Sequence, residues 1–293
     1  MALSKYEIFM KVVELKSLTK AAKEMGYTQS AVSHAIGALE GEAKLKLLTR
    51  SRAGVSLTPD GERLLPSMRQ IVEAKRGYEE TVAAIHGLET GCVRIGAFTS
   101  VAVHWLPGMI KKYGADHPST EIKMLNGDYH DIVQWFLNGS IDIGFVTEKT
   151  SIPGCDYIPL REDRLLIALP KDHPLAGREV LKVKEIAHQP FISLLENSDQ
   201  DARSVLEQAG VSVDVKFTTK DDYAIIAMVE QGLGISIMPE LLLEGHSDGI
   251  CVARIEGGKK RTIGLAVSPA AQRSPSVQSF LEYAQKWVKE RYG

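Results

Sequence analysis

The amino-acid sequence predicts an α/β protein of at least two domains: an all-α segment at the N-terminus, a long linker helix, and a C-terminal α/β region of two subdomains. Three observations carry this prediction. The chain has 293 residues, which reaches the roughly 250 to 300 residues at which one hydrophobic core stops growing. Helical patterns occupy its first ninety residues. Short apolar strand patterns then alternate with helical ones, as is typical of α/β folds.

Composition excludes several classes of protein. Apolar residues make up 44% of the chain and charged residues 25%, as in ordinary soluble globular proteins. No run approaches the ~18 uncharged apolar residues of a membrane helix. The N-terminus mixes Lys5, Glu7, Lys11 and Glu14 among its apolar residues, so it lacks the apolar core of a secretory signal. We therefore expect a cytoplasmic protein with no membrane partner.

The three cysteines, Cys92, Cys155 and Cys251, are far apart, and no Cys-x-x-Cys pair indicates a zinc or redox motif. We expect reduced, mostly buried thiols. A redox-sensing cysteine is the alternative, which the lack of a neighbouring resolving cysteine disfavours.

Charge is unevenly distributed along the chain. The formal net charge is -2, which alone argues against a basic coat for nucleic acid. Residues 1–59, however, carry nine basic side chains: Lys5, Lys11, Lys16, Lys20, Lys23, Lys44, Lys46, Arg50 and Arg52. The same segment carries only five acidic ones: Glu7, Glu14, Glu24, Glu40 and Glu42. Cations confined to one module are compatible with DNA binding.

The first sixty residues predict three short helices. Tyr6, Phe9 and Val12 recur at helical spacing, so the first helix spans roughly residues 4–15. Thr19 is the expected N-cap of the second helix, and Gly26 closes it in the left-handed conformation that glycine adopts readily. Thr28 caps a third helix. A helix, a tight turn and another helix form the helix-turn-helix arrangement.

The third helix has a small polar outer face. Val32, Ile36 and Leu39 fall on one side at ~100° per residue, and polar residues point the other way. Such a face fits a major groove, although a solvated amphipathic helix is the alternative. Residues 50–58 predict a hairpin with Gly54 near its tip, a wing that can lie along phosphates. The candidate DNA-binding residues are Thr28, Gln29, Ser30, Ser33, His34, Arg50 and Arg52.

Several residues of this segment occur in a recognisable order. They are Ser17, Leu18, Thr19, Lys20, Ala21 and Ala22, then Thr28, Gln29, Ser30, Ala31, Val32 and Ser33, then Ile36, Leu39, Glu40, Leu47 and Arg50, and finally Leu57, Thr58, Pro59, Asp60 and Gly61. Their order and spacing resemble the N-terminal signature of LysR-type transcriptional regulators. The resemblance implies a winged helix-turn-helix that binds DNA, a helical dimerisation linker and a C-terminal domain that senses a small molecule.

Three positions depart from that family pattern. Ser30 replaces a common proline, Lys44 a usual glycine, and Leu48 a typical phenylalanine. The serine changes only how the third helix begins. A lysine held at positive φ costs on the order of 1 kcal/mol relative to glycine. We therefore expect a slightly different turn at Lys44 within the same fold.

The linker predicts one long helix. Thr58 is its cap, Pro59 its first residue, and Glu62 lies in its first turn. A heptad-like stripe follows, which includes Lys75 and the candidate dimer seam of Leu64, Met68, Ile71, Tyr78, Val82 and Ile85. This stripe implies a partner helix, and packing on the chain's own C-terminal domain is the alternative. Pro66 predicts a bend or an unpaired carbonyl in the first turns.

The rest of the chain predicts a sheet of mostly parallel strands. The expected strands are residues 92–97, 122–125, 141–146, 165–169, 191–195, 213–217, 235–238 and 263–267. A charged, turn-like stretch at residues 161–164 and a final helix at 277–288 suggest two subdomains. The expected domains are residues 1–58, 59–90 and 91–293, with subdomain I at about 91–161 and 266–293 and subdomain II at about 162–265. This region resembles the periplasmic-binding-protein-like sensor of the same family.

Polar residues follow several of these strands, where ligands of open α/β folds bind. The candidate effector-binding residues are Thr99, Ser100, Gly127, Asp128, Thr147, Glu196, Ser198 and Thr219. Each can instead be a plain helix cap. The hydroxyl groups suit an anion, whereas Asp128 and Glu196 suit an amino or hydroxyl group, so the class of ligand stays open.

The sequence contains no Gly-x-Ser-x-Gly, His-Glu-x-x-His or Walker motif, so we expect no catalytic residues, no cofactor and no metal. Residues 128–131 are read as a solvated loop, and residues 257–261 as a hairpin tip. The sequence thus predicts a DNA-binding regulator modulated by a small molecule. Its expected partners are double-stranded operator DNA, the effector and further copies of itself, as a dimer or, as the resemblance implies, a tetramer; RNA polymerase stays open as another. The alternative is a cytoplasmic solute-binding or small-molecule-processing protein with an N-terminal oligomerisation module.

Overall fold

The computed structural model describes residues 5–51, 54–86, 90–150, 152–195, 200–269 and 271–293. The chain divides into two compact units. The first contains residues 1–88, 137–139 and 270–275, and the second contains residues 89–136, 140–269 and 276–293. No helix of the described residues is long and apolar enough to span a membrane.

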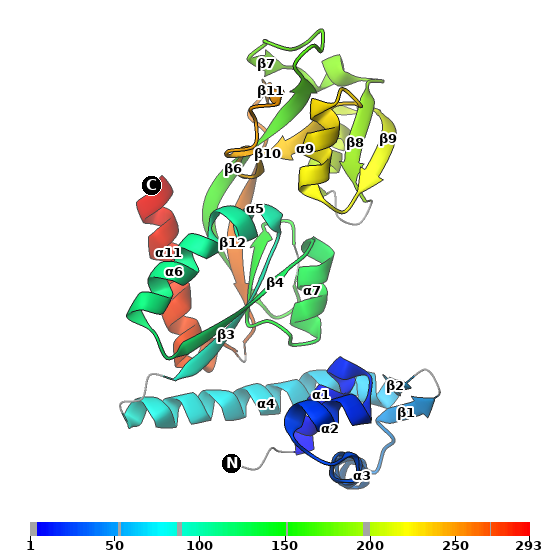
Figure 1. The fold of residues 1–293 in the computed structure, drawn as a ribbon, viewed down its shortest axis with the longest axis vertical. Coiled ribbons are helices and arrows are strands. Elements are labelled where there is room, and N and C mark those ends of the chain that lie inside the picture. The colour runs from blue at the N-terminus through cyan, green and yellow to red at the C-terminus, as the bar shows by residue number, and fades with distance from the viewer. Residues whose placement is uncertain (1–4, 52–53, 87–89, 151, 196–199, 270) are drawn as a thin grey trace. The chain divides into compact units, whose positions relative to one another are not determined.

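The N-terminal unit is a winged helix-turn-helix followed by one long helix (Figure 1). Its elements are α1 (Lys5–Leu15), α2 (Leu18–Met25), α3 (Gln29–Ala43), β1 (Leu48–Ser51), β2 (Gly54–Leu57) and α4 (Pro59–Ile85). Phe9, Val12, Ile36 and Leu47 are fully buried between them. The three predicted helices and the predicted wing are therefore confirmed; the helices rested on local apolar spacing and caps, and the wing on the glycine near its tip.

The N-cap residue is the one that the sequence predicted at two of three helices, α3 and α4. Thr28 Oγ1 accepts the N–H of Ala31 at 3.2 Å, and Thr58 Oγ1 accepts the N–H of Gly61 at 3.0 Å. Thr19 does not cap α2, because the helix begins two residues earlier than a Thr19 cap would allow, and Ser17 Oγ accepts the N–H of Lys20 at 3.2 Å. Both hydroxyl residues suit an N-cap, and the prediction chose the wrong one of two close candidates.

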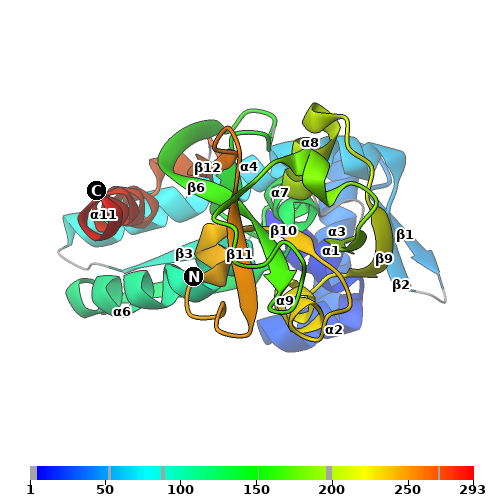
Figure 2. The same cartoon turned by 90° about the horizontal axis from the view of Figure 1, so that it is seen from above.

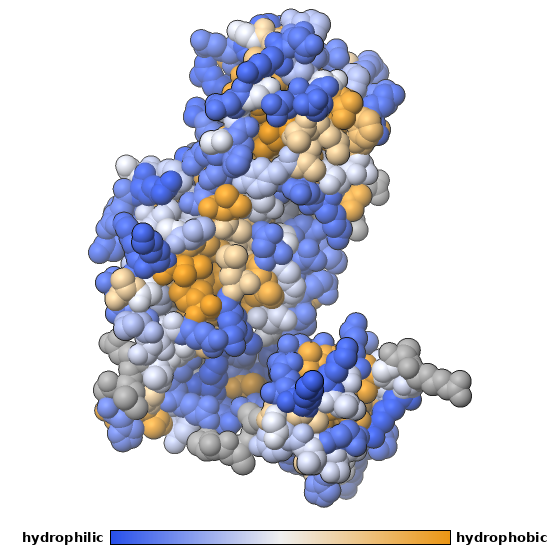
Figure 3. Space-filling view, viewed as in Figure 1, coloured by the Kyte–Doolittle hydropathy of each residue, from blue (hydrophilic) through white to orange (hydrophobic). Residues whose placement is uncertain are grey.

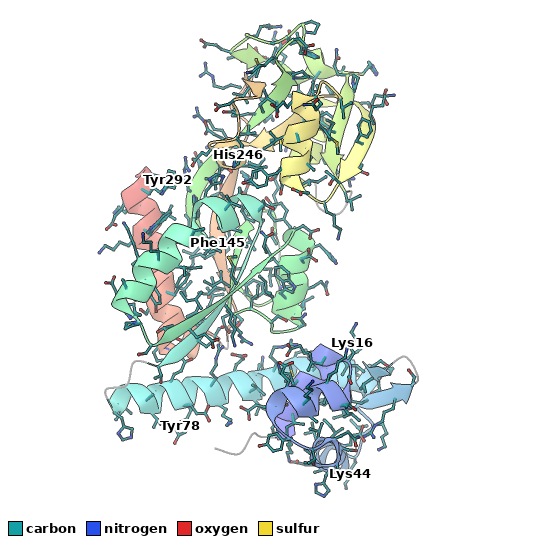
Figure 4. The ribbon with its side chains drawn as sticks, in the orientation of Figure 1. Lys16, Lys44, Tyr78, Phe145, His246 and Tyr292 are labelled. Atoms are coloured by element: carbon teal, nitrogen blue, oxygen red, sulfur yellow. The ribbon has the colours of Figure 1, made fainter. Side chains whose placement is uncertain are left out.

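Lys44 ends α3 in the left-handed conformation, with φ 53° and ψ 33°. The expected change of turn was therefore wrong: lysine adopts the conformation that glycine favours, and its N–H donates to Glu40 O. Figure 4 marks this residue at the end of α3.

Replacing Lys44 with glycine should raise the free energy of unfolding of the N-terminal unit by about 1 kcal/mol, because glycine has no Cβ to strain at positive φ. Urea denaturation followed by circular dichroism measures this change. Lys44→Ala is the control, since it removes the charge and keeps the Cβ. An equal effect of both substitutions would show that the strain is not the cause.

The wing is anchored to the turn that precedes α2. Val55 N donates to Lys16 O at 2.9 Å. Gly54 has φ 123°, and a Cβ at this position would lie 2.8 Å from Lys16 O, so a larger residue does not fit. β1 and β2 pair antiparallel, with Arg50 opposite Val55.

The helix α4 is assigned without a break through Pro66. Its start is fixed as the sequence predicted, by Thr58, Pro59 and an acidic first turn. Lys75 Nζ lies 2.9 Å from Glu7 Oε2 of α1, so an ion pair holds the middle of the long helix against the first helix of the same unit.

The C-terminal unit begins with β3 (Gly91–Ala97), α5 (Thr99–His104), α6 (Leu106–Asp116), β4 (Thr120–Asn126), α7 (Tyr129–Leu137), β5 (Ile143–Thr147) and β6 (Asp156–Pro170). It continues with β7 (Val180–Leu181), a 3-10 turn (Val183–Ile186), β8 (Pro190–Leu194), α8 (Gln200–Ala209), β9 (Asp214–Thr219) and α9 (Asp222–Glu230). It ends with β10 (Ser236–Pro239), α10 (Glu240–Leu243), β11 (Ile250–Ile255), β12 (Lys260–Val267), a second 3-10 turn (Ala271–Arg273) and α11 (Pro275–Tyr292).

The sheet is mixed, whereas the sequence predicted mostly parallel strands. Its order is β4-β3-β5-β12-β6-β11-β7, and β10 also pairs with β6. β3 is parallel to β4 and β5, and β8 is parallel to β9. β12, β10 and β11 are antiparallel to β6. The long strand β6 therefore belongs to both halves of the unit, one built on β3 to β5 and the other on β8 to β10 (Figures 1 and 2).

Residues 161–164 were predicted to be a turn and instead lie within β6. Their charges are paired with neighbouring elements: Glu162 with Lys260, Asp163 with Arg261, and Arg164 with Glu240. The turn at Gly257 and Gly258 is not a hairpin tip either. The strands on its two sides, β11 and β12, both pair with β6 rather than with each other.

Helices cover both faces of the first half. α6 and α11 lie together on one face, with the ring centroids of Tyr113 and Phe280 5.2 Å apart. α7 covers the other, since a Cβ on Gly144 would meet Phe136 at 2.4 Å. Apolar side chains also reach the surface of the C-terminal unit (Figure 3), and Met124 and Leu125 of the edge strand β4 are exposed.

Candidate functional site

The outer face of α3 presents polar groups to solvent. Thr28, Gln29, Ser30 and His34 are exposed, and Ser33 is half-buried. Thr28 Oγ1 also lies 3.0 Å from Ser30 Oγ. The predicted base-reading residues therefore lie along the first two turns of one helix, with hydroxyl, amide and imidazole groups available for base edges.

The wing is joined to this helix by a side-chain hydrogen bond. Arg50 of β1 donates from Nη2 to Ser33 Oγ at 3.1 Å. The structure thus brings Ser33 and Arg50 together, so the strand that leads into the wing is positioned relative to α3. Arg52, the other predicted wing contact, lies outside the described residues.

Glu40 fixes the connection between α3 and the wing. Its carboxylate is buried and accepts the N–H groups of Leu47 at 2.9 Å and Leu48 at 3.3 Å, and Lys46 Nζ lies 2.7 Å away. Burial acts to raise the pKa of Glu40, but these hydrogen bonds outweigh it and the pKa is lowered. The glutamate of the sequence pattern is therefore a structural residue that orders β1.

Five of the six candidate seam residues divide into two groups, and the sixth, Val82, is half-buried. Met68 is buried in the core of the N-terminal unit, and Leu64 packs against the same core. Ile71, Tyr78 and Ile85 are instead 45%, 67% and 77% exposed, and Figure 4 marks Tyr78 on α4. These three are spaced by seven residues, so they form a single apolar stripe along the helix.

A cavity of about 270 Å³ opens in the C-terminal unit. Four predicted effector residues line it: Thr99, Ser100, Gly127 and Asp128. They follow β3 and β4, the parallel strands whose carboxyl ends lie side by side.

Of the other four predicted effector residues, Thr147 and Thr219 are not among the described residues that line the cavity. Thr147 is buried, with its hydroxyl 3.4 Å from Thr150 Oγ1. Thr219 Oγ1 accepts the N–H of Asp221 at 3.1 Å. Glu196 and Ser198 lie outside the described residues.

Arg261 of β12 is buried at the cavity, and all five of its N–H groups have acceptors. Nε and Nη2 donate to Asp163 Oδ2 at 2.9 and 2.7 Å. Nη2 also donates to Ser100 Oγ at 2.9 Å. Nη1 donates to Tyr129 Oη at 2.8 Å and to Asp201 Oδ2 at 3.0 Å. The guanidinium therefore links both halves of the unit through its hydrogen bonds.

Two further contacts complete this cluster. The Tyr129 hydroxyl donates to Asp201 Oδ2 at 2.9 Å, and burial raises the pKa of Tyr129, so the phenol stays protonated at neutral pH. Leu241 N donates to Asp163 Oδ1 at 3.0 Å. Two carboxylates and one guanidinium are thus held together away from solvent, where the loss of either sign leaves an uncompensated charge.

Sequence reasoning missed Arg261, Tyr129, Asp201 and Asp222 as cavity residues. Arg261 ends a Gly-Gly-Lys-Lys-Arg run that resembles an exposed turn. Its partners Asp163 and Tyr129 are 98 and 132 residues away, so no local pattern connects them. Asp128 and Asp131 were read as a solvated loop, but they close the start of α7 by exchanging N–H bonds at 3.2 and 2.8 Å.

The three cysteines are half-buried and none forms a disulfide. Burial, with a smaller effect of Asp156, raises the pKa of Cys155 to about 11. A thiol of this pKa is protonated at neutral pH and is a weak nucleophile.

Comparisons with known proteins agree with this division of the chain. Residues 3–62 match the model of the bacterial regulatory helix-turn-helix protein, lysR family. Residues 86–289 match the model of the LysR substrate binding domain.

Individual proteins match over the full length. The uncharacterized HTH-type transcriptional regulator YvbU of Bacillus subtilis is 29% identical over 289 residues, which covers 98% of each chain. A full-length OxyR variant from Pseudomonas aeruginosa has a TM-score of 0.81 at 20% identity and covers 99% of this chain and 95% of its own. The full-length regulator CbnR, solved with its target DNA, has a TM-score of 0.58 at 22% identity over 97% of this chain and 98% of its own.

The two family models together match most of the chain, and the residues between the two matches, 63–85, belong to α4. The chain belongs to the LysR family of transcriptional regulators.

Proposed function

We propose that this protein is a non-catalytic, cytoplasmic regulator that binds operator DNA through α3 and the wing and responds to a small molecule bound in the cavity of its C-terminal unit. The observation that carries the proposal is the polar face of α3, which Arg50 and Ser33 join to the wing. The family assignment favours this function over that of a solute-binding protein with an oligomerisation module.

We keep the domain boundaries that the sequence predicted. We place the DNA-binding domain at residues 1–58, the linker at 59–90 and the effector domain at 91–293. Within the last, subdomain I at about 91–161 and 266–293 and subdomain II at about 162–265 would meet inside β6 and β12. A shift of one subdomain on ligand binding would then reach the other subdomain through the continuous strands β6 and β12.

The DNA contacts divide into readers and anchors. Gln29, Ser33 and His34 would meet base edges, whereas Arg52 would bind backbone phosphates. His34→Ala should lower the discrimination between operator and scrambled DNA by about 1 to 3 kcal/mol. Arg52→Ala should instead weaken both DNAs alike and flatten the dependence of affinity on salt.

Fluorescence anisotropy with the intergenic DNA beside the coding sequence measures both effects. Ser33→Ala is informative as well, because it removes the acceptor of Arg50 and should affect reading and wing placement together. Full operator discrimination in the Ser33 and His34 variants would show that α3 is not the reader.

The effector site is proposed without Thr147 and Thr219, while Glu196 and Ser198, which lie outside the described residues, stay predictions. We assign it to Thr99, Ser100, Gly127 and Asp128, which line the cavity. In a thermal-shift screen of small metabolites, Ser100→Ala should reduce the stabilisation by a ligand by about 0.5 to 1.5 kcal/mol, since one hydrogen bond is lost. Thr147→Val is the control, because Thr147 does not line the cavity.

A ligand whose stabilisation is undiminished in Ser100→Ala would place the effector site elsewhere. Because a ligand shifts an equilibrium only by its differential affinity for the two states, the same substitution should weaken the response of DNA binding to that ligand.

A further inference from the structure

Carboxylates dominate the charged lining of the cavity. Four of its residues are acidic, namely Asp128, Asp131, Asp201 and Asp222, and two are basic, Lys220 and Arg261. Lys220 is exposed to solvent, where its charge is screened. The balance of charge in the interior of the cavity therefore rests on Arg261.

Arg261 has no N–H group available to donate to a ligand. Its N–H groups are all donated to Asp163, Ser100, Tyr129 and Asp201. Its charge is opposed by the carboxylates of Asp163 and Asp201, at 2.7 and 3.0 Å. An anionic group in the cavity would therefore meet a guanidinium that is already neutralised, together with three further carboxylates.

Helix N-termini attract anions, and carboxylates already cap two of those at the cavity, whereas the short helix α5 has no side-chain cap. Asp128 Oδ1 accepts the N–H of Asp131 at the start of α7. Asp221 Oδ1 accepts the N–H groups of Tyr223 at 2.9 Å and Ala224 at 3.4 Å at the start of α9. The side chains of the protein thus already supply negative charge to these two ends.

One carboxylate oxygen at the cavity has no hydrogen-bond donor among the described residues. Asp201 is 8% exposed and lines the cavity. Its Oδ2 accepts from Tyr129 and Arg261, whereas Oδ1 is buried and no donor among the described residues reaches it. A buried acceptor without a donor is unfavourable, so a donor brought by a ligand would be favoured at this atom.

We propose that the effector is a small organic cation whose protonated amine donates a hydrogen bond to Asp201 Oδ1, among the carboxylates of Asp128, Asp131 and Asp222. This inference rests on the proposed function, in which the effector occupies this cavity. A charge-assisted hydrogen bond from an ammonium group supplies both the donor and the opposite charge.

The remaining lining fits the rest of such a ligand. Apolar side chains contribute Leu194, Ile225, Met238 and Leu242, which suit a short hydrocarbon chain. The volume of about 270 Å³ lies just below the usual range for small-molecule sites, roughly 300 to 1,000 Å³, which suits a small ligand. Asp222 accepts a hydrogen bond from Thr99, and burial raises the pKa of Asp222, so a nearby cation would stabilise its ionised form.

The test compares amines with analogues of the same length on the full-length protein. Putrescine and cadaverine are titrated by calorimetry and thermal shift, beside the diols of equal chain length and beside succinate and glutarate, at one ionic strength. At least one amine should bind and raise the melting temperature, and its diol and dicarboxylate should not. Asp201→Asn should weaken binding of that amine roughly tenfold or more, because a charge-assisted hydrogen bond is lost.

Two further variants separate binding from folding. Asp222→Asn removes a cavity carboxylate that accepts none of the Arg261 hydrogen bonds, and it should also weaken binding of the amine. Asp214→Asn removes an exposed carboxylate of β9, paired with Lys216 at 2.7 Å, and should leave amine binding unchanged. Circular dichroism confirms that each variant is folded before it is titrated.

The ligand class is overturned if no amine binds, or if a diol or dicarboxylate binds as tightly as the amine. It is also overturned if amine binding is unchanged in both Asp201→Asn and Asp222→Asn. If a dicarboxylate binds and Ser100→Ala weakens its binding, the proposal of a cationic ligand is wrong, but the effector site of the proposed function stays in place. If a ligand binds and no cavity variant changes its affinity, both the cationic ligand class and the proposed effector site are wrong.

Discussion

Replacing Arg261 with methionine should lower the free energy of unfolding of the C-terminal unit by about 3 to 5 kcal/mol, the cost of removing one partner of a buried ion pair. Methionine occupies similar space, so the loss is mainly electrostatic. Among the described residues, Asp163 would then keep the hydrogen bond from Leu241, and Asp201 would keep the one from Tyr129. Both carboxylates would then lie in the interior without a cation.

A matched ion pair on the same sheet provides the control. Arg164 donates to Glu240 from Nε and Nη2, at 2.8 and 2.6 Å, but its side chain is 59% exposed. Arg164→Met should therefore cost about 0 to 1 kcal/mol. Urea denaturation of both variants measures the difference. If both substitutions lower the free energy of unfolding equally, burial does not make the Arg261 cluster more important for stability than the exposed pair.

A combined variant checks the cause. Arg261→Met together with Asp163→Asn and Asp201→Asn removes the uncompensated charges, so it should be more stable than Arg261→Met alone. If the combined variant is less stable, the loss in Arg261→Met comes from packing rather than from the buried carboxylates.

The second large effect concerns the exposed stripe of α4. Replacing Ile71 or Tyr78 with aspartate should lower the oligomeric mass and weaken operator binding by roughly a thousandfold or more, because one half-site offers too few contacts for specific affinity. A charge in the centre of an apolar seam must be buried without a partner when two helices associate. Light scattering reports the mass, and fluorescence anisotropy reports the affinity for DNA.

Gln70→Asp is the control for this experiment. It introduces the same charge at an exposed polar position about 100° away around the helix, and it should leave both mass and affinity unchanged. A monomeric Ile71 variant with unaltered operator affinity would contradict the seam. An unaltered mass in both the Ile71 and the Tyr78 variants would contradict it as well.

The winged domain was largely predictable because its information is local. Apolar spacing placed α1 and α3, and Thr28 and Thr58 were recognised as caps. Thr19 was the wrong N-cap because Ser17, two residues earlier, suits that position equally well. Lys44 shows the opposite case: its intrinsic preference predicted another turn, and the surrounding structure imposed the left-handed conformation.

The cavity was only half predictable. Thr99, Ser100, Gly127 and Asp128 were found because they directly follow strands. Arg261 and Asp201 were not, because their roles come from side chains 60 or more residues away in the sequence. Residues 161–164 were misread for the same reason, since charges that pair across strands resemble a solvated turn when their partners are unknown.

Footprinting of the full-length protein on the intergenic DNA beside its coding sequence tests the central claim most directly. A LysR-type dimer with α3 in the major groove should protect two half-sites related by two-fold symmetry and spaced by about one helical turn or a multiple of it. Protection should be lost with His34→Ala at concentrations where Gln70→Asp still protects. Uniform, sequence-independent coverage of the DNA, with no protected half-sites, would contradict the account.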